Sequence, residues 1–221
     1  MINDAVAPQS EEFGIYYDSP RSGLIGLLPA GGYGRALEVG CGSGANLVEL
    51  QRRFPDCRTT GIELREEAAQ GARGRVDEVL VGSVLDPACC DFAPGSFDVL
   101  VLSHVLEHFA EPAQVLQRVL PWLAPQGRVL VALPNVRHAS VLRELVLHGD
   151  FRYRSSGLMD HTHLRFFTRR SAIRFMQEQG LAVERCEPDF QGRKSALLRR
   201  LSFGLATEFA AFAFNFLARK A

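Results

Sequence analysis

The sequence predicts an α/β fold built on a doubly wound sheet, with helices on both faces of mostly parallel strands. Strand-like and helix-like patterns alternate from residue 36 to residue 135, which is typical of this fold class. The first apolar strand runs directly into a glycine turn and then a helical pattern, at residues 36–46. The length of 221 residues suits one domain with a sizeable core.

The glycine turn is the stretch around which the chain is organised. Gly40, Gly42 and Gly44 follow the strand at residues 36–39, and such a turn lets backbone N–H groups approach a ligand closely. Glu38 is the unusual member, because a buried carboxylate is costly unless a cation pairs with it. These residues therefore predict a ligand with a positive group rather than a turn without a ligand.

Residues 38–44, Glu-Val-Gly-Cys-Gly-Ser-Gly, resemble motif I of the class I S-adenosylmethionine (SAM)-dependent methyltransferases at every defined position. The resemblance implies a Rossmann-like sheet of seven mostly parallel strands, in the order 3-2-1-4-5-7-6. It also implies SAM (S-adenosyl-L-methionine) as cofactor, with its ammonium group paired with Glu38. Residues 40–45 also fit the looser dinucleotide fingerprint G-x-G-x-x-G/A, so an NAD(P)-dependent oxidoreductase stays open as an alternative.

The next two strands are expected to supply further cofactor contacts. Glu63 ends the second strand at residues 59–64, where both families place an acid for the ribose hydroxyls. After the third strand, at residues 79–84, Ser83 replaces the aspartate that commonly binds the adenine amino group, although its hydroxyl can accept the same bond. By resemblance, the cofactor-binding residues are Tyr17, Arg21, Glu38, Gly40, Cys41, Gly42, Gly44, Glu63, Leu64, Ser83, Val84, Ser103 and His104.

The segment ahead of motif I, Tyr-Tyr-x-x-x-Arg, resembles the cap segment of bacterial glycan-type methyltransferases. There an aromatic residue and an arginine, here Tyr17 and Arg21, close over the methionine end of SAM. The other interpretation is the start of an amphipathic helix with a surface arginine. Residues 1–14 are expected to form a mobile lead-in without the features of a signal peptide.

Residues 95–109 provide the second specific match. A Gly-x-Phe-Asp turn into an apolar strand, followed by Val-Leu-Glu-His at residues 105–108, resembles the fourth-strand motif of the same superfamily. Dehydrogenases do not share it. His104 follows this strand and is expected to face the methyl-donor end of the pocket, whereas Glu107 and His108 are interpreted as structural.

The remaining elements are expected to complete the sheet. The predicted helices cover residues 112–123, 136–149 and 169–179, the last with Thr168 as N-cap, and the predicted strands cover residues 128–135, 181–188 and 212–220. A membrane-surface helix at residues 201–218 is the rival interpretation of the C-terminus. Glu208 interrupts it and it is too short for a clean span, so we expect a strand and no stable membrane insertion.

Residues 136–168 break the regular alternation and are expected to form a lid on the substrate side. Residues 157–167 resemble the Gly-x-x-Asp-x-x-His-x-Arg-x-Phe segment of methyltransferases found with polysaccharide biosynthesis. In that family the segment lies over the active site. The alternative is that its histidines and arginine merely tie the segment to the sheet edge.

Methyl transfer to a hydroxyl requires alignment of the acceptor and a group that takes its proton. Histidine suits this role near neutral pH, and we rank the candidate bases as His163, His161 and then His104. His104-x-x-Glu107-His108 also resembles the Glu-x-x-Glu-His of ubiquinone-type O-methyltransferases, which can use a divalent cation. Because histidine replaces the first glutamate and no further acidic ligand is evident, we predict no metal site.

The amino-acid composition limits the kinds of partner that the sequence predicts. The chain has 25 basic and 25 acidic residues, so no global basic field gathers nucleic acid. Five cysteines without framework spacing indicate a reducing, cytoplasmic compartment.

Taken together, these features predict a SAM-dependent methyltransferase that acts on oxygen of a small-molecule or sugar-type (glycan) acceptor. The expected domain covers residues 1–221, and the prediction allows a homodimer. The alternatives are a ubiquinone-like aromatic acceptor, the oxidoreductase named above, and a SAM-binding regulatory protein without catalysis.

Overall fold

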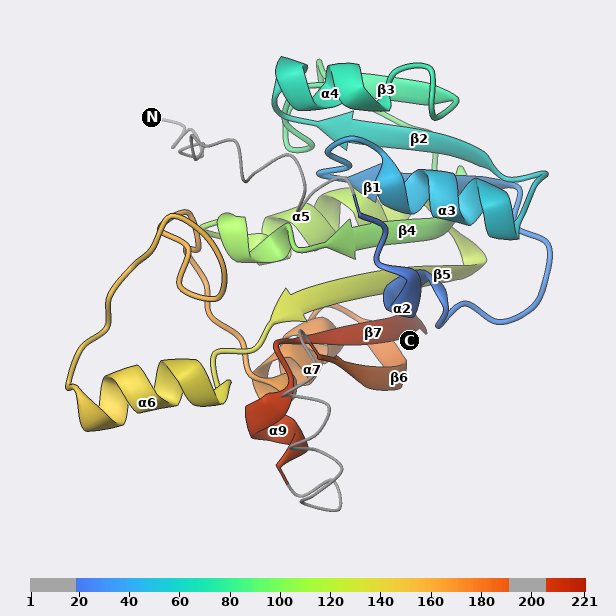
Figure 1. Cartoon of the computed structure of the whole chain (residues 1–221). Helices are drawn as coiled ribbons and strands as arrows, with labels where there is room; N and C mark the ends of the chain where they lie inside the picture. Colours follow the sequence, from blue (N-terminus) through green and yellow to red (C-terminus); the bar gives the residue numbers. More distant parts are fainter. Residues whose placement is uncertain (1–18, 191–205) are drawn as a thin grey trace.

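The computed structural model describes residues 19–190 and 206–221, and these form a seven-stranded sheet with helices on both faces (Figure 1). The strands are β1 (Arg35–Val39), β2 (Arg58–Glu63), β3 (Glu78–Val81), β4 (Phe97–Ser103), β5 (Leu123–Pro134), β6 (Leu181–Asp189) and β7 (Ala213–Lys220). The helices are α2 (Ser22–Ile25), α3 (Ala45–Arg53), α4 (Glu66–Ala72), α5 (Pro112–Val119), α6 (Ala139–Leu147), α7 (Arg169–Glu178) and α9 (Thr207–Ala210), with short 3-10 turns η1 (Leu106–His108) and η2 (Leu120–Trp122). Tyr17 and the lead-in at residues 1–14 lie outside the described residues.

The strand order β3-β2-β1-β4-β5-β7-β6 confirms the prediction. Neighbouring strands from β3 to β5 are parallel, and β7 runs antiparallel between β5 and β6. The expected C-terminal strand is therefore correct, and residues 213–220 are not part of a membrane-surface helix. Within the described ranges, every helix is too short or too polar to cross a bilayer.

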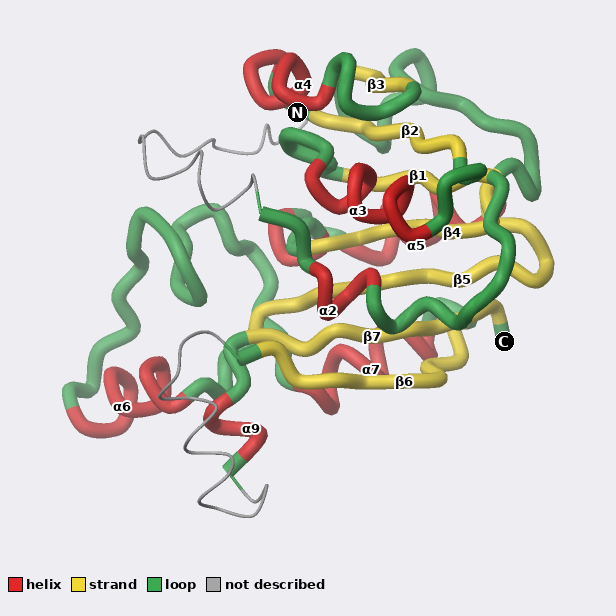
Figure 2. Tube along the Cα trace, turned by 45° about the vertical axis from the view of Figure 1, so that its right-hand side comes forward, coloured by secondary structure: helices red, strands yellow, loops and turns green. Residues whose placement is uncertain are grey.

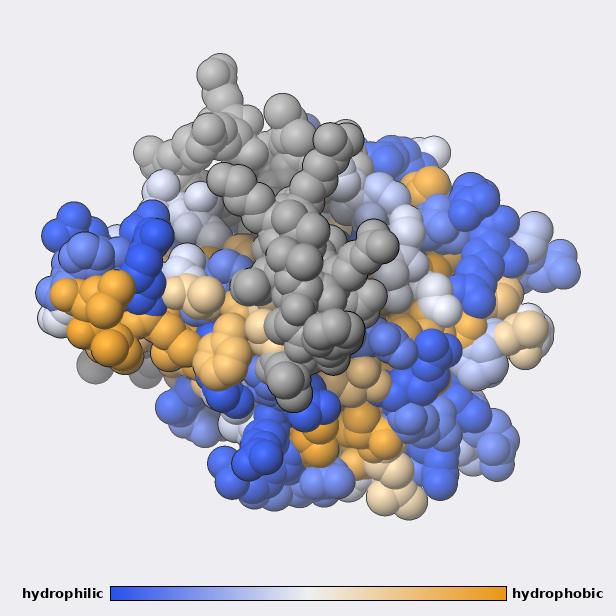
Figure 3. Space-filling view, turned by 60° about the horizontal axis from the view of Figure 1, so that its bottom comes forward, coloured by the Kyte–Doolittle hydropathy of each residue, from blue (hydrophilic) through white to orange (hydrophobic). Residues whose placement is uncertain are grey.

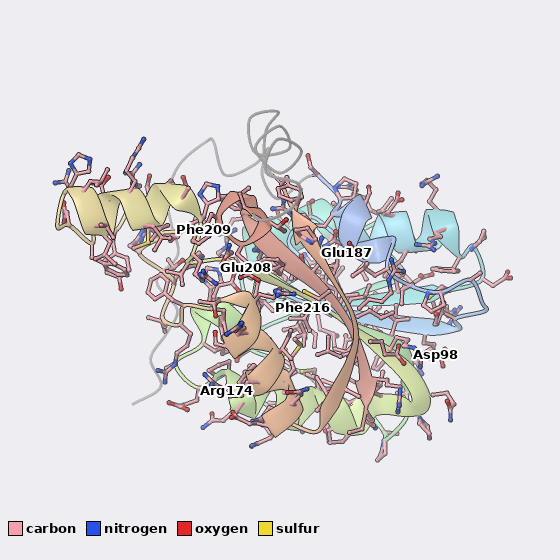
Figure 4. The ribbon with its side chains drawn as sticks, turned by 90° about the horizontal axis from the view of Figure 1, so that it is seen from below. Asp98, Arg174, Glu187, Glu208, Phe209 and Phe216 are labelled. Atoms are coloured by element: carbon pink, nitrogen blue, oxygen red, sulfur yellow. The ribbon has the colours of Figure 1, made fainter. Side chains whose placement is uncertain are left out.

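The two faces of the sheet bury separate apolar layers. On one face, α5 and α7 cover side chains that include Leu100, Val131 and Phe216. On the other, α2 and α3 cover a layer that includes Val101 and Leu130. Figures 1 and 2 show α2 and α3 in front of the sheet, with α5 and α7 behind it. Figure 4, from below, shows Phe216 close to α7.

The parallel strands place their carboxyl ends at one edge, and this edge positions the site. β1 lies between β2 and β4, with Glu38 opposite Gly61 on one side and Val101 on the other. Asp98 fixes the start of β1, because its Oδ2 atom accepts the N–H groups of Gly34 and Arg35 at 2.7 and 3.0 Å. The glycine turn then emerges between β2 and β4, as expected for a ligand site in a doubly wound sheet.

Several element ends differ from the prediction, including the start of β5 at Leu123 rather than residue 128, and two of them have a clear local cause. The helix expected to reach residue 123 ends at Val119, because Pro121 cannot donate the next helical hydrogen bond, and Leu123 pairs with Phe97 in the sheet. The third strand ends at Val81 rather than residue 84. Gly82 has a φ of 142°, and a Cβ atom there would lie 2.7 Å from the Cys89 sulfur, so the chain turns away at this point.

Thr168 is the N-cap of α7, as predicted. Its Oγ1 atom accepts the Ser171 N–H at 3.2 Å, and the Ser171 hydroxyl accepts the Thr168 N–H at 2.9 Å. Thr168→Ala is expected to lower the free energy of unfolding by about 1 kcal/mol, measured by urea denaturation, because the cap bonds are lost. Thr168→Ser keeps the capping oxygen, so an equal loss in both variants would contradict a capping role.

Candidate active site

The glycine turn connects β1 to α3 in a conformation that side chains would obstruct. Gly40, Gly42 and Gly44 have φ values of 70°, 52° and 78°. At Gly44 a Cβ atom would also lie 2.9 Å from the Val76 side chain. Both the positive φ and this close contact therefore favour glycine at position 44. Gly40 lines the cleft at the carboxyl edge of the sheet, whereas Gly42 and Gly44 are buried and let the chain turn tightly into α3.

Glu38 is the central acidic group of the site. It is 1% exposed, and its Oε1 atom accepts a hydrogen bond from Asn46 Nδ2 at 2.7 Å. Its Oε2 atom has no hydrogen-bond partner in the described part of the chain. Burial raises the pKa of Glu38 to about 8, partly offset by the Asn46 bond and reinforced by Glu63. A cation next to Oε2 would satisfy this carboxylate, which is the fit that a SAM ammonium group requires.

Asn46 is a site residue to which the sequence analysis gave no role. Besides holding Glu38, its Oδ1 atom accepts the backbone N–H of Arg21 at 2.7 Å. It therefore joins the segment before α2 to the acid in β1. A polar side chain in the first turn of α3, directly after the glycines, is the signal that could have identified it.

A cleft opens beside Glu38 at the carboxyl ends of β1 and β4. It is lined by Ser19, Arg21, Glu38, Gly40, Cys41, Ala45, Asn46, Ser103 and His104. Six of these residues belong to the predicted cofactor set: Arg21, Glu38, Gly40, Cys41, Ser103 and His104. Ser19, Ala45 and Asn46 were not predicted. Burial raises the pKa of the Cys41 thiol, so this cysteine is a neutral part of the wall.

Glu63 braces the turn from the neighbouring strand. Its Oε2 atom accepts the Gly42 N–H at 2.9 Å, and its Oε1 atom accepts the Arg65 N–H at 3.1 Å. Each oxygen retains a second lone pair, so the carboxylate can also accept ribose hydroxyls. Leu64, directly after it, is 51% exposed.

The predicted adenine-side residues are divided between surface and core. The Ser83 hydroxyl is partly exposed and accepts the Leu85 N–H at 3.2 Å. Val84 is 2% exposed and its side chain belongs to the core layer under α5. Only the backbone of Val84 is therefore available to a ligand.

His104 is the histidine that the fold brings to the cleft. It follows β4 with a φ of 52°, a conformation uncommon outside glycine and often found at functional sites. Its Nδ1 atom lies 3.4 Å from Glu107 Oε1. Its Nε2 atom is buried without a hydrogen-bond partner among the described residues, and the residue lines the cleft with Glu38.

Glu107 forms a buried cluster with three histidines. Burial alone would raise the pKa of Glu107, but His104, His108 and His163 outweigh it and hold the pKa below its ordinary value. The rings of His108 and His163 meet edge to face, with centroids 4.9 Å apart. Ligand atoms of Glu107, His108 and His163 lie within 4.8 Å of one another, so this set, rather than His104, Glu107 and His108, has the proximity to hold a cation.

The 136–168 segment is joined to this cluster. The Glu107 carbonyl accepts the N–H groups of Leu164 and Arg165 at 2.8 and 3.0 Å. The His108 ring lies 3.0 Å from the Thr162 hydroxyl. These bonds fit the alternative in which the segment is tied to the sheet edge, a link that sequence spacing alone does not reveal.

The two histidines ranked first as bases do not line the cleft. His163 is 7% exposed, its Nδ1 atom lies 3.2 Å from the Leu158 carbonyl, and burial lowers its pKa. His161 is on the outside, with its Nδ1 atom 3.2 Å from the Arg154 carbonyl and 3.6 Å from Asp160.

The sheet order, the acid in β1 and the glycine turn define a class I SAM-dependent methyltransferase. A family model described as a methyltransferase domain matches residues 18–185, and the chain belongs to this family. This finding favours SAM over the dinucleotide that the glycine spacing also allowed.

Three proteins to which the chain is similar illustrate the relationship. The ubiquinone biosynthesis O-methyltransferase of Aeromonas salmonicida (strain A449) is 26% identical over 153 residues. The match covers 67% of this chain but only 63% of that relative. A Thermotoga maritima structure, described as a possible histamine N-methyltransferase, superposes with a TM-score of 0.63 at 18% identity, over 93% of this chain and 89% of its own. The [4+2]-cyclase SpnF also has a TM-score of 0.63 at 18% identity, covering 99% and 84% of the two chains.

Glu38→Gln is expected to stabilise the ligand-free protein at about pH 8. Folding raises the pKa of Glu38 from 4.5 to about 8, so the folded state favours the protonated carboxyl group. The resulting contribution to the free energy of unfolding is complete below pH 4.5 and is lost as the pH rises toward 8. Glutamine does not ionise and escapes this loss, which is on the order of a few kcal/mol.

Urea denaturation between about pH 5 and pH 8 measures the effect. The advantage of the Gln variant should grow across this range, whereas Glu67→Gln, at an exposed position on α4, should show no such trend. A constant difference between wild type and Glu38→Gln would show that Glu38 is already ionised in the ligand-free fold.

Proposed function

We propose that this protein transfers the methyl group of SAM to an oxygen atom of a small-molecule or sugar-type acceptor. The observation that carries the proposal is Glu38, a fully buried carboxylate with an unsatisfied oxygen beside a cleft. The cost of burying it is explained if a cationic ligand completes the site.

Different residues around the glycine turn would contact different parts of SAM. Glu38 would hold the ammonium group, while Asn46 keeps the carboxylate in place. Glu63 would accept the ribose hydroxyls, and Leu64 with Ser83 would contact the adenine. SAM supplies a methyl group on a sulfonium centre that is already a good leaving group, so the protein mainly has to align the acceptor.

His104 is the proposed base, moved ahead of His163 and His161 by its place in the cleft. Its Nε2 atom would take the proton of the acceptor hydroxyl, while Nδ1 faces Glu107. Glu107 would act as a positioning residue that fixes the ring and stabilises its charged form. The 3.4 Å separation is long for a hydrogen bond, as catalytic contacts often are before substrate binds.

Two similarities support the choice of acceptor. The Aeromonas relative is named as an O-methyltransferase, which favours oxygen and keeps a ubiquinone-like aromatic acceptor as the nearest rival. The resemblance of residues 157–167 favours a sugar-type acceptor beneath the 136–168 segment. The proposed reaction uses no metal, and treatment with a chelator tests whether Glu107, His108 and His163, which have the proximity to hold a cation, bind one.

A second candidate is a SAM-binding protein that performs another reaction or none. The likeness to a cyclase shows that this fold alone does not fix the reaction. Binding of SAM without methyl transfer to any phenolic or sugar acceptor would favour this candidate.

Cofactor choice is tested by thermal unfolding with SAM, S-adenosylhomocysteine, NAD and NADP in parallel. The adenosyl compounds at about 100 times Kd should add about 2.7 kcal/mol, and the nicotinamide compounds nothing. Glu38→Ala should abolish the gain, because the cationic end of the ligand loses its partner, and Glu67→Ala should preserve it. A response to NAD or NADP alone would refute SAM as cofactor.

The base is tested by transfer of labelled methyl groups to a panel of phenols and sugars. His104→Ala should lower kcat by about 10²- to 10⁴-fold with little change in the Kd of SAM, because only proton removal is lost. Glu107→Gln should lower kcat less and alter its pH profile, since it keeps the shape of Glu107 but not its charge.

His148→Ala removes an exposed histidine at the end of α6 and should leave kcat unchanged. Treatment with a chelator should also leave kcat unchanged. Loss of activity on chelation, restored by a divalent cation, would replace this account by a metal-dependent one. Equal activity of His104→Ala and wild type would exclude His104 as base.

A further inference from the structure

The end of α6 and the loop after it concentrate exposed apolar side chains. Nine large hydrophobic residues are exposed in the described ranges, and five of them lie between residues 145 and 153. We call these five the apolar tip: Leu145, Val146, Leu147, Phe151 and Tyr153. Val146 and Leu147 are 73% and 72% exposed, and Figure 3 shows apolar residues gathered at this end of the molecule. Such a patch on a soluble fold marks an interaction surface.

The apolar tip is held in a defined position by packing contacts. The inner face of α6 is anchored, because Val141 packs in a small core with Leu158 and Met159. Phe151 meets Tyr153 and Phe166 edge to face, at centroid distances of 5.8 and 5.5 Å. These contacts hold the outer face in place beyond the sheet, where Figures 1, 2 and 4 show α6 projecting.

Residues 137–174, which include α6 and part of α7, carry a net positive charge. Residues 137–174 contain eight arginines against three acidic residues, an excess of five positive charges in a chain whose net charge is zero. Glu111 and Glu208, from outside the segment, pair with three of these arginines, which leaves an excess of three. At the apolar tip itself, Glu144 and Asp150 pair with Arg154 and Arg152, and Arg143 adds a further charge.

A hollow opens beside the apolar tip, between α6 and residues 150–159. Its lining combines Arg143, Arg152 and Arg154 with the acidic Glu144 and Asp150 and with the apolar side chains of Val141 and Leu158. Guanidinium groups next to apolar surface match the phosphate and the upper acyl region of a phospholipid. Figure 4 shows Glu208 and Phe209 of α9 close to the start of α6, which further fixes its orientation.

We propose that the apolar tip docks this protein onto the surface of an anionic phospholipid bilayer. Aliphatic side chains at a projecting helix end, two aromatic rings and flanking arginines are the composition of an interfacial anchor. Three arginines against two acidic residues leave this face with a net positive charge of one, which an anionic bilayer attracts and a second copy of the same face repels. Docking is peripheral, requires no membrane-spanning segment, and does not depend on the proposed methyl transfer.

The experiment is cosedimentation of the purified chain with vesicles of phosphatidylcholine alone or mixed equally with phosphatidylglycerol. We expect the chain to bind the mixed vesicles, with affinity that falls as salt rises, and to bind neutral vesicles weakly. The double variant Val146→Glu with Leu147→Glu should weaken binding at least about tenfold, because both side chains would have to carry charge into the interface. Arg143→Glu should weaken binding to the mixed vesicles only.

Val81→Glu is the matched control, since Val81 is an exposed apolar residue at the other edge of the sheet and should not alter binding. Unchanged unfolding of the tip variants shows that they fold, as expected for side chains already in solvent. No binding to mixed vesicles, or equal binding by the double variant, would overturn the proposal. A concentration-dependent dimer that the double variant abolishes, without vesicle binding, would assign the face to a second copy instead.

Discussion

The burial of the Glu38 carboxylate is the constraint on which the structure of the site depends. β1 carries this acid into the middle of a parallel sheet, where water cannot solvate it. One oxygen is bonded to Asn46 and the other has no partner among the described residues. A fold that tolerates such a group gives up stability at neutral pH, and binding of a cation recovers it.

The second buried carboxylate, Glu107, is stabilised in its charged form by neighbouring side chains, unlike Glu38. Three histidines from the end of β4, from η1 and from the 136–168 segment surround it, and its pKa falls below the ordinary value. The pKa of Glu38 rises instead, because burial dominates and no such cluster of histidines surrounds it in the described ranges. Two equally buried acids thus have different roles: Glu107 organises the chain around it, and Glu38 is prepared for a ligand.

Local patterns were sufficient to predict the glycine turn and the alternation of strands and helices, because these signals lie close together in the sequence. The sheet order came from the family resemblance of motif I and the fourth-strand segment, since local patterns do not fix which strands are neighbours. Arg21, Glu38, Ser103 and His104, which the sequence predicts as cofactor contacts, all line the cleft. The link between Glu107 and residues 162–165 spans more than fifty positions and depends on how loops meet in space, so spacing did not reveal it. For the same reason the ranking of the histidines favoured His163, which the fold directs into the buried cluster.

The most direct test of this account is the number of protons released when SAM binds, measured by titration calorimetry at pH 7 in buffers of different ionisation enthalpy. Glu38 should lose its proton when SAM binds, which releases close to one proton per complex. The α-amino group of SAM, with a pKa of about 8, should take up a small fraction of a proton, so the net release by the wild type should be somewhat less than one. The variant Asp98→Asn, remote from the cleft, should behave as the wild type. Binding of SAM with no proton release would contradict the claim that Glu38 is held protonated in the ligand-free protein and pairs with the cation.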